Sequence, residues 1–426
     1  MHATRMKKLG RILGMVGAVA AAAWAGAADL GVPATDDGLP GDGPIRRADW
    51  FRKHWLQRRE AWEGRREIDR HALVFVGDSI TEGWGDGFRG QFGGLKLANR
   101  GISGDTSRGV LARLGHDVMD LEPVGIVLLV GTNDIEEGAA PEVIAANVRL
   151  ILGQIRERRP DVPVIVCDVF PSAASMRRPS GVIRKVNELV AKVTPGFPNV
   201  TRVETWQLFA TGQGDARPSE FPDLLHLNDA GYARWAAALR PLLATLGYTE
   251  TAEDGFEPEP GFSPLFNGRD LTGWGFRTNE FSGLTRSPEG RYLARHGRLV
   301  VGTPPEGRRF DAIWTTRSFT NDFVLKLEFR ATPYADSGIF LRKPQLQCRD
   351  YLIAGPYTNL TRYRAQDWNE IVVSVTNGVA HCTCNGEVIE AALKLPASGP
   401  IGLEGDRGQM EYRRIRLRER RGGAGW

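Results

Sequence analysis

The amino-acid sequence predicts a two-domain protein in which a doubly wound α/β parallel sheet is followed by an all-β sandwich. The chain of 426 residues is longer than one hydrophobic core usually spans. Between residues 72 and 247, apolar runs alternate with helical stretches, a pattern typical of a parallel sheet covered by helices on both faces. Beyond residue 262, apolar and polar residues alternate with a period of two, as in strands with one buried face.

Residues 1–27 have the features of a secretory signal peptide. An apolar run over residues 12–23 is followed by small residues, which predicts cleavage after Ala27. The run is shorter than the roughly 20 residues that cross a bilayer, so a membrane anchor is the less favoured alternative. We therefore expect an exported protein, periplasmic or extracellular, with no integral membrane segment after cleavage. Four basic residues precede the apolar run: Arg5, Lys7, Lys8 and Arg11.

The charge of the chain does not indicate a nucleic-acid partner. The formal net charge is +4, and cleavage of the signal peptide would remove four positive charges and leave the mature chain neutral. A nucleic-acid-binding domain usually keeps a basic surface in its folded part. The arginines between residues 413 and 421 largely alternate with apolar residues, which favours one solvated strand face followed by a frayed end.

The elements of the first domain follow in order along the chain. After a lead-in, a helix is expected over residues 48–69, so residues 28–71 precede the α/β domain at 72–248. Apolar runs predict its five strands at 72–76, 95–98, 125–130, 162–166 and 200–203. Four apolar residues recur at intervals of three and four and would line one helix face: Ile144, Val148, Ile151 and Ile155. A helix over 228–246 closes the domain, and residues 249–261 form a linker rich in Glu, Pro and Gly.

The second domain is expected over residues 262–419, with a tail at 420–426. Phe323, Leu325, Leu327 and Phe329 alternate with polar or smaller residues and predict a strand with one buried face. Asn-Gly pairs at 377–378 and 385–386 flank a short apolar run, so two consecutive hairpins are expected there.

Polar motifs follow the predicted strands of the first domain. Ser79 lies in Gly-Asp-Ser-Ile after the first strand, and Gly104 comes after the second. Asn133 lies in Gly-Thr-Asn-Asp after the third strand, and Asp223 and His226 come in Asp-Leu-Leu-His beyond the fifth. Because the carboxyl ends of parallel strands meet at one edge of the sheet, these residues are expected to converge there.

The convergent residues supply what an acyl-transfer site needs. A serine hydroxyl is a poor nucleophile at neutral pH, so His226 would take the proton of Ser79 while Asp223 holds the imidazole tautomer. The backbone N–H groups of Ser79 and Gly104 and the side-chain amide of Asn133 would stabilise the oxyanion. This mechanism requires no metal ion and no organic cofactor.

Each of these motifs has a structural explanation when taken alone. Gly-Asp-Ser is a common turn sequence, Gly-Thr-Asn is a plausible helix cap, and a single histidine is more often structural. Their occurrence together, in order and at strand ends, favours the catalytic interpretation. Asp78, Asp105 and Asp134 are assigned to loops and caps with no catalytic role.

With these motifs in place, residues 72–247 resemble the SGNH (GDSL-type) serine hydrolase family, especially its platelet-activating-factor-acetylhydrolase-like branch. The resemblance implies a flavodoxin-like fold and gives Ser79, Gly104, Asn133 and His226 the four signature roles, with Asp223 completing the triad. It also implies hydrolysis of acetyl, acyl or lipid esters, thioesters or sugar O-acyl groups. Ile80 stands where the family name has leucine, a conservative change.

Three further segments, at residues 264–274, 336–342 and 399–406, resemble the 3-keto-disaccharide hydrolase family, which implies a concanavalin-like jelly-roll sandwich associated with sugars. Trp274, Arg342 and Glu404 are then candidate sugar-binding residues, although Trp274 could equally be a core aromatic residue. The family usually shows a glutamate where this chain has Gln345 in Gln-Leu-Gln. An amide cannot act as a general acid or base at ordinary pH, so a binding role is favoured over catalysis.

The four cysteines give two expectations. Cys167 lies in an apolar run and is expected to be a buried free thiol. Cys382 and Cys384 share one strand face, and a disulfide from Cys348 to either of them is one alternative for an exported protein. Their spacing is a weak metal signal, and no metal site is assigned.

Together these observations predict an exported serine esterase that removes acyl groups, most simply acetyl, from carbohydrates. The substrate is expected to be a carbohydrate or another acylated small molecule, with no nucleic-acid partner. Alternatives are a lipid acyl-ester hydrolase of the lysophospholipase type, a bifunctional protein whose second domain hydrolyses 3-keto glycosides, and a glycan-binding protein whose first domain is only a scaffold.

Overall fold

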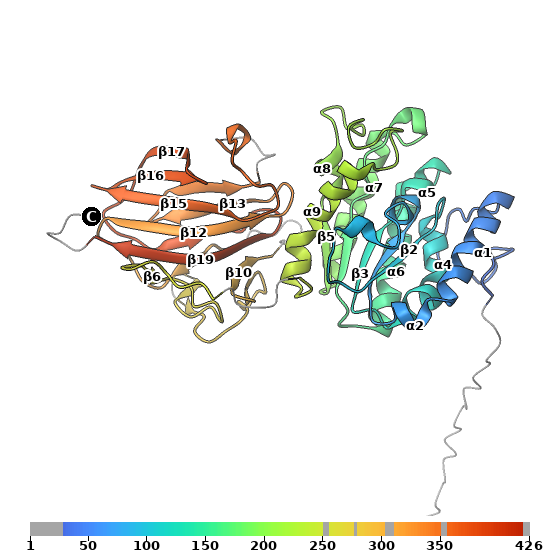
Figure 1. The fold of residues 1–426 in the computed structure, drawn as a ribbon, viewed down its shortest axis with the longest axis horizontal. Coiled ribbons are helices and arrows are strands. Elements are labelled where there is room, and N and C mark those ends of the chain that lie inside the picture. Colours follow the sequence, from blue (N-terminus) through green and yellow to red (C-terminus); the bar gives the residue numbers. More distant parts are fainter. Residues whose placement is uncertain (1–28, 250–254, 277–278, 303–310, 351–355, 421–426) are drawn as a thin grey trace, which may run out of the picture.

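The computed structural model describes residues 29–249, 255–276, 279–302, 311–350 and 356–420. Within these ranges the chain forms an α/β domain followed by a β-sandwich, and the two lie side by side (Figure 1). This is the predicted fold class. The predicted signal peptide at 1–27 and most of the tail at 420–426 fall outside the described residues.

The first domain is built on a parallel sheet with the strand order β2-β1-β3-β4-β5. Its central strands are buried on both faces, which explains why they appear in the sequence as continuous apolar runs. The strand bounds are β1 (Leu73–Gly77), β2 (Leu97–Gly101), β3 (Gly125–Leu129), β4 (Val164–Cys167) and β5 (Val200–Val203).

Strand β2 differs most from its predicted position. The apolar run at 95–98 predicts a strand that ends at Ala98, whereas β2 continues through Asn99 and Arg100, which are both buried. Asn99 donates to the Thr81 carbonyl at 2.8 Å, and Arg100 forms an ion pair with Asp69 at 2.8 Å. These partners make burial of the polar side chains tolerable, and the apolar pattern contains no sign of them.

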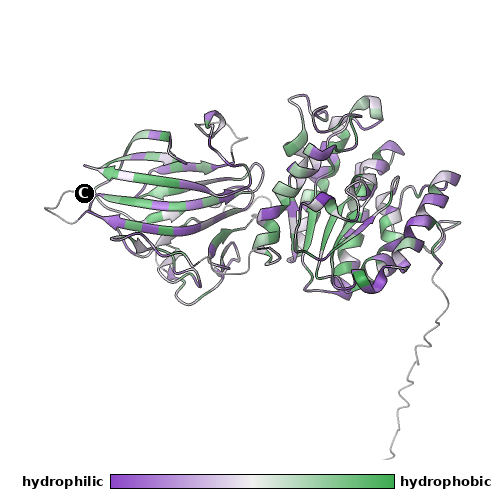
Figure 2. Ribbon diagram, viewed as in Figure 1, coloured by the Kyte–Doolittle hydropathy of each residue, from purple (hydrophilic) through white to green (hydrophobic). Residues whose placement is uncertain are grey.

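Helices cover both faces of this sheet. Helices α4, α6 and α7 pack on one face and α9 on the other, so the domain is doubly wound. Figure 2 shows apolar strands at the centre and hydrophilic residues on the outer sides of the helices. The helix bounds are α1 (Asp49–Glu63), α2 (Arg66–Asp69), α3 (Ser79–Glu82), α4 (Ser107–Asp117), α5 (Thr132–Glu136), α6 (Pro141–Arg158), α7 (Ser180–Val193), α8 (Thr205–Phe209) and α9 (Asp229–Thr245). The short 3-10 turns of this domain are Phe88–Gly90, Met119–Leu121, Ala174–Met176 and Thr194–Gly196, and the second domain has one at Pro356–Asn359.

The N-terminal helix α1 is an integral part of this domain. Phe51, Trp55 and Trp62 are buried in a small hydrophobic cluster with Ile102. Arg59, also buried on α1, forms a 2.9 Å ion pair with Asp117 at the end of α4. The helix therefore brings the residues before β1 close to the loop that follows β2.

The second domain packs two antiparallel sheets around one hydrophobic core. The larger sheet has the order β17-β16-β15-β12-β19-β10-β9, with β6 paired to β19, and the smaller sheet has the order β14-β13-β18-β11-β7-β8. The strand bounds are β6 (Ser263–Pro264), β7 (Trp274–Phe276), β8 (Asn279–Glu280), β9 (Tyr292–Arg295), β10 (Arg298–Val301), β11 (Ile313–Thr315), β12 (Phe323–Ala331), β13 (Asp336–Leu341), β14 (Gln345–Arg349), β15 (Asn369–Thr376), β16 (Val379–Cys384), β17 (Glu387–Lys394), β18 (Ile401–Leu403) and β19 (Met410–Glu419).

The local patterns that predict this sandwich are present in the structure. Every second residue of β12 from Phe323 to Ala331 is fully buried. The two Asn-Gly pairs connect β15 to β16 and β16 to β17, and all four residues have positive φ angles between 49° and 81°. These angles fit the left-handed conformations of a two-residue hairpin turn, which asparagine and glycine adopt most readily.

A buried polar contact joins the two domains. Thr245, the last residue of α9, donates a 2.6 Å hydrogen bond to Glu411 on β19 and accepts one from Gln409 at 2.9 Å. Glu411 is fully buried and also pairs with Arg298 and Arg330. Helix α9 lies on the side of the α/β domain that faces the sandwich (Figure 1). We call the set Thr245, Gln409 and Glu411 the docking contact.

The cysteines correct one expectation. All four are buried free thiols, so the alternative of a disulfide from Cys348 to Cys382 or Cys384 is wrong. Cys348 lies with Cys382 and Cys384 in the apolar core of the sandwich, where burial raises the pKa of the Cys348 thiol well above the usual value. These side chains fill core volume as small hydrophobic groups do. Cys167 is buried and free, as expected.

Candidate active site

Ser79 stands at the sharp turn between β1 and α3. Asp78 caps this helix, because its Oδ1 accepts the Ile80 N–H at 2.9 Å. The strand must end in a glycine, since a Cβ atom on Gly77 would lie 2.1 Å from the Leu129 carbonyl oxygen. As the first residue of a helix, Ser79 has a backbone N–H with no acceptor inside that helix.

Ser79, His226 and Asp223 form a continuous chain of hydrogen bonds. The distance from Ser79 Oγ to His226 Nε2 is 3.0 Å, and the distance from His226 Nδ1 to Asp223 Oδ2 is 2.6 Å. The Asp223 side chain also organises its own turn, because its Oδ1 accepts the backbone N–H groups of Leu225 and His226 at 3.0 and 2.7 Å. Burial alone would raise the pKa of Asp223, but these hydrogen bonds and the imidazole outweigh it and lower the pKa. Asp223 is therefore ionised at neutral pH.

Solvent reaches all three side chains, although none is fully exposed. Ser79 is half-buried, and the side chains of His226 and Asp223 are 44% and 50% exposed. A large substrate could therefore reach the serine without the opening of a lid.

Gly104, in the loop after β2, and Asn133, at the start of α5, follow neighbouring segments at the carboxyl edge of the sheet. Gly104 has a φ angle of +87°, and a Cβ atom there would lie 2.6 Å from Cη2 of Trp50, so only glycine fits. Asn133 is the second residue of α5, and its Nδ2 donates to the Asp105 carbonyl at 2.8 Å, next to Gly104. The structure thus links Asn133 to the residue that follows Gly104, as it links Ser79 to His226 and Asp223.

Two carboxylates without a predicted catalytic role hold these loops in place. Asp105 forms a buried ion pair with Arg113 at 2.8 Å. Asp134 accepts both the backbone N–H and the hydroxyl of Ser107, at 2.9 and 2.5 Å. Both are fully buried, and burial raises the pKa of each to about 6. The sequence analysis missed Arg113, because an arginine in a helix gives no sign of being buried.

Arg178 is the second residue near the site that the sequence analysis missed. Its Nη2 donates to the Oδ1 of Asn133 at 3.1 Å, and the side chain is only 2% exposed. The surrounding sequence, Met176-Arg177-Arg178-Pro179, has the composition of a solvated loop.

We predict that Asn133→Ala lowers kcat by about 10²–10³-fold with little change in KM, because an oxyanion donor acts mainly in the transition state. Initial rates of p-nitrophenyl acetate hydrolysis would measure the effect. Asn187→Ala is a suitable control, since Asn187 is a buried helical asparagine whose amide binds only the backbone of Val169. Equal losses of kcat in both variants would contradict the prediction.

We predict that Asp78 makes the folded state less stable as the pH rises. Burial raises the pKa of Asp78 to about 7, whereas an unfolded aspartate titrates near about 3.9. Below about pH 4 both states hold the proton, and between about pH 4 and 7 only the folded state does, so the free energy of unfolding falls by up to about 4 kcal/mol over this interval. Urea unfolding of Asp78→Asn should show a shallower decrease from pH 5 to pH 8 than the wild type. Parallel pH profiles would contradict this.

In the sandwich, two of the three candidate sugar-binding residues are structural. Trp274 is fully buried in the core, and its indole N–H donates to the Leu265 carbonyl at 2.7 Å. Arg342 is 6% exposed and donates to the carbonyls of Pro396 and Asn321 at 2.8 and 2.6 Å. Neither side chain is available to a sugar, so these two expectations were wrong. The sequence cannot distinguish a core tryptophan from an exposed one.

Glu404 is the third candidate, and it lies on the outer face of the smaller sheet. Its carboxylate accepts a hydrogen bond from Gln345, which in turn accepts one from Gln347 at 3.2 Å. Partial burial raises the pKa of Glu404, and the nearby Asp406 raises it further. Gln345, the residue that departs from the family pattern, therefore lies directly beside this carboxylate.

An aromatic pair lies on the same outer face. The rings of Trp314 and Phe340 stack with centroids 5.0 Å apart and an interplanar angle of 27°. Trp314 lies flat over the backbone of Gly402, where a Cβ atom would be 2.7 Å from the indole ring. Both aromatic residues are only half-buried. We call this surface, made of Trp314, Phe340, Gln345, Gln347 and Glu404, the sandwich face.

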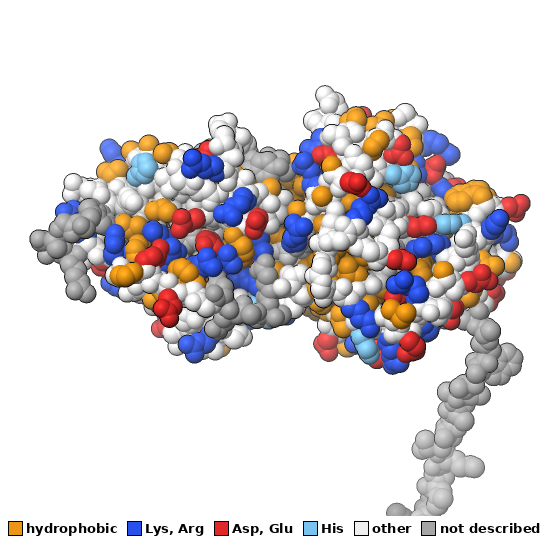
Figure 3. Space-filling view, viewed as in Figure 1, with side chains coloured by type: hydrophobic (Ala, Val, Ile, Leu, Met, Phe, Trp, Pro, Cys, Tyr) orange, Lys and Arg blue, Asp and Glu red, His pale blue; other side chains and the backbone are white. Residues whose placement is uncertain are grey.

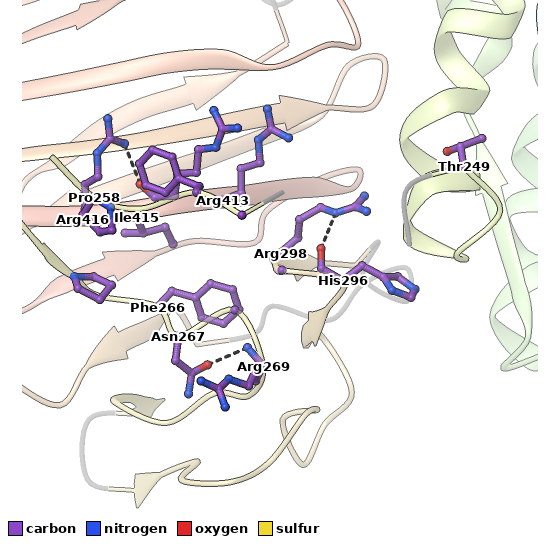
Figure 4. A pocket seen from close by; sticks show the side chains of 16 residues that line it. Thr249, Pro258, Phe266, Asn267, Arg269, His296, Arg298, Arg413, Ile415 and Arg416 are labelled. Atoms are coloured by element: carbon purple, nitrogen blue, oxygen red, sulfur yellow. Dashed lines mark hydrogen bonds between the residues drawn. The ribbon is translucent and has the colours of Figure 1, made fainter. Parts of the chain in front are cut away.

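A separate pocket of about 690 Å³ lies at the edge of the sandwich near the linker (Figure 4). Arg298, Arg413 and Arg416 line it from the larger sheet, and Arg269 lines it from the loop after β6. Carboxylates already neutralise three of these arginines, and Arg416, for example, pairs with Glu259 at 2.6 Å. None of the predicted site residues lines this pocket.

Positive and negative side chains are interspersed on the surface shown in Figure 3. In the described parts of the chain, no three His, Cys, Asp or Glu side chains are grouped in a way that could hold a metal ion. Among the helices of the described ranges, none is both long and apolar enough to cross a bilayer.

Sequence comparisons match each domain to a family. The model of the GDSL-like lipase/acylhydrolase family matches residues 75–234, and that of the 3-keto-alpha-glucoside-1,2-lyase-like domain matches residues 261–418. The human platelet-activating factor acetylhydrolase IB subunit alpha2 is 33% identical over 189 residues, which cover 43% of this chain and 80% of that protein. The bovine subunit alpha1 is 31% identical over 199 residues, which cover 45% and 83% respectively.

Solved structures also align with parts of the chain. A GDSL-like lipase from Bacteroides thetaiotaomicron has 23% identity and a TM-score of 0.38, with 44% of this chain and 96% of that chain covered. A variant of an acetyl-xylooligosaccharide esterase from Geobacillus has 24% identity and a TM-score of 0.34, with 41% and 94% covered.

Proposed function

Because the chain belongs to the GDSL-like lipase/acylhydrolase family and is a hydrolase of ester bonds, we propose that Ser79, His226 and Asp223 form a triad that removes acetyl groups from carbohydrates. The observation that carries the proposal is the hydrogen-bonded chain from Ser79 Oγ through the imidazole to Asp223. A serine joined to a base, with the base oriented by a carboxylate, is the arrangement that activates a hydroxyl nucleophile.

The mechanism follows from these contacts. His226 Nε2 takes the proton of Ser79 as Oγ attacks the ester carbonyl carbon, and Asp223 stabilises the imidazolium that forms. The backbone N–H groups of Ser79 and Gly104 and the amide of Asn133 stabilise the oxyanion. Collapse of the tetrahedral intermediate passes the proton to the leaving alcohol and leaves an acyl-serine. Water, activated by the same imidazole, then releases the acid.

The acetyl part of the proposal draws support from the relatives. Two of the similar proteins are named acetylhydrolases, and this chain covers at least 80% of each. In this chain, Trp50 lies against Gly104 and limits the space on one side of the proposed oxyanion site.

The carbohydrate part draws support from two exposed surfaces. Trp50 is 53% exposed beside Gly104 and offers an aromatic ring to a sugar near the reacting ester. The sandwich face combines the aromatic pair of Trp314 and Phe340 with the amide and carboxylate groups beside them, a set suited to stacking on a sugar and binding its hydroxyls. The second domain belongs to a family named for an alpha-glucoside, which agrees with this role.

We further propose that the enzyme is exported. Residues 1–27 have the basic, apolar and small-residue order of a signal peptide. N-terminal sequencing of protein secreted by a bacterial host should find Ala28 as the first residue, and a retained Met1 would overturn this proposal.

The proposed function is tested with a panel of esters and the mature protein. Acetate release from acetylated mono- and oligosaccharides is compared with hydrolysis of p-nitrophenyl esters of increasing chain length and of a lysophospholipid. Acetylated oligosaccharides should give the highest kcat/KM. A preference for long acyl chains would instead indicate a lipid substrate, and hydrolysis of none of the esters would overturn the assignment.

We predict that Trp50→Ala raises KM for acetylated oligosaccharides by about 3–10-fold, the effect expected from losing one aromatic stacking contact. The kcat/KM for p-nitrophenyl acetate should change less than twofold. Leu56→Ala is the matched control, because Leu56 is also an exposed apolar residue of α1, at 39% exposure. If Trp50→Ala affects both substrates equally, Trp50 does not contact the sugar.

A further inference from the structure

The side-chain amide of Asn133 is held from both sides. On one side, its Nδ2 donates to the Asp105 carbonyl at 2.8 Å. On the other side, its Oδ1 accepts from Arg178 Nη2 at 3.1 Å. An amide has two N–H groups, so after the bond to Asp105 one N–H of Asn133 remains for the oxyanion.

The Arg178 guanidinium is itself fixed in one position. Its Nε donates to both the carbonyl and the hydroxyl of Thr132, at 3.1 and 3.0 Å. Its Nη1 donates to the Met176 carbonyl at 2.7 Å, and its Nη2 also binds Glu136 at 2.8 Å. The planar, five-donor geometry of a guanidinium allows all these bonds at once.

We propose that Arg178 is a positioning residue that sets the orientation of the Asn133 amide, and so keeps one N–H directed at the reacting oxygen. The inference rests on the proposed function, because it concerns the same oxyanion site. If the amide were turned over, Oδ1 would face the Asp105 carbonyl and Nδ2 would face the guanidinium. Both contacts would then be repulsive, so Arg178 and Asp105 together exclude that orientation.

The outer end of this network reaches the N-terminal segment. Glu136 lies between two arginines, because it binds Arg178 on one side and Arg46 on the other. Arg46 also binds Glu137 at 2.7 Å. Burial alone would raise the pKa of Glu136, but the hydrogen bonds and charges of Arg46 and Arg178 outweigh it and lower the pKa. Glu136 is thus a carboxylate that anchors Arg178 at neutral pH.

This network predicts how a loss of Arg178 would appear in the kinetics. Without the guanidinium, Oδ1 loses its charged donor and the amide can rotate, so the oxyanion donor is correctly placed for only part of the time. Because the oxyanion forms mainly in the transition state, kcat should fall and KM should change little. The expected loss is about 10–100-fold, less than the loss on removal of Asn133 itself.

The test is a double-mutant cycle on the mature protein with p-nitrophenyl acetate, a substrate that does not depend on carbohydrate recognition. Arg178→Met and Arg178→Lys are measured alone and in the Asn133→Ala background. Arg59→Met is the matched control, since Arg59 is equally buried and ion-paired but binds Asp117 at the far end of α4. Thermal unfolding of each variant shows how much stability is lost.

The inference holds if Arg178→Met lowers kcat about 10–100-fold in the wild-type background and less than threefold in the Asn133→Ala background. Arg178→Lys should fall between Arg178→Met and the wild type, and Arg59→Met should keep kcat within about twofold. Equal effects of Arg178→Met in both backgrounds would overturn the inference, as would an unchanged kcat. If Arg178→Met does not fold, Glu136→Gln replaces it in the test. This isosteric change removes the carboxylate that anchors Arg178, and kcat should decrease by about 2–5-fold.

The proposed function and this inference fail in different ways. If the wild type hydrolyses no ester, or if Ser79→Ala is as active as the wild type, the proposed function fails. If the wild type depends on Ser79 but not on Arg178, only the inference about Arg178 fails.

Discussion

Ser79→Ala should abolish ester hydrolysis, with a decrease in kcat of at least about 10⁴-fold. The methyl group cannot form the acyl-enzyme, and neither the imidazole nor the oxyanion donors can replace the missing nucleophile. The folded state should be retained, because Ser79 Oγ has His226 as its hydrogen-bond partner and the half-buried site leaves no cavity in the core. Initial rates with p-nitrophenyl acetate, together with the thermal unfolding midpoint, would measure both effects.

The control for this result is Ser219→Ala. Ser219 is an exposed serine whose hydroxyl binds Glu220, so its removal should leave kcat unchanged. Mass spectrometry adds a second readout, because an organophosphonate should label the wild type once and Ser79→Ala not at all. Comparable turnover in Ser79→Ala and the wild type would mean that another residue is the nucleophile.

Asp223→Asn should lower kcat on the order of 10³–10⁴-fold. The 2.6 Å contact with His226 Nδ1 holds the tautomer in which Nε2 can accept the Ser79 proton. An asparagine amide that turned its N–H groups toward Nδ1 would favour the other tautomer, in which Nε2 carries a hydrogen and cannot act as a base. Because Asp223 is half exposed, water can partly compensate, and the loss should be smaller than for Ser79→Ala.

The kinetic signature of Asp223→Asn distinguishes this role from a structural one. KM should stay within about twofold of the wild type, since Asp223 contacts no substrate in the proposed mechanism. Asp215→Asn, at another exposed aspartate, is the control. A decrease in kcat of less than about tenfold in Asp223→Asn would show that another group orients His226.

The sequence predicted the α/β domain well because its signals are local. Apolar runs fix β1 and β3, and Ser79 and Asn133 follow directly where those strands end. Since parallel strands bring their carboxyl ends to one edge, their order in the sequence was enough to place the residues together. Family membership adds the reaction type to this placement.

Several features that the sequence did not predict depend on contacts between residues that are distant in the chain. Arg178 lies in a polar stretch of sequence, and its burial results from groups on α5 that are more than 40 residues away. Asn99 and Arg100 similarly extend β2 beyond its apolar run because their partners bury them. In the sandwich, Trp274 was a candidate sugar contact because an aromatic ring can stack on a sugar, and its residue type fits a core position equally well; the structure buries it fully.

The docking contact has a consequence for substrates that reach both domains. A flexible tether would let the sandwich present a bound glycan at many separations from Ser79, whereas a fixed arrangement raises the effective concentration of the ester at one separation only. Glu411 is buried between Arg298 and Arg330 and accepts a hydrogen bond from Thr245. Separation of the two domains would break that hydrogen bond and expose the paired charges of Glu411 and the two arginines to water. For the proposed carbohydrate substrate, chain length then determines rate, because only a glycan that spans this fixed separation gains from binding at both sites.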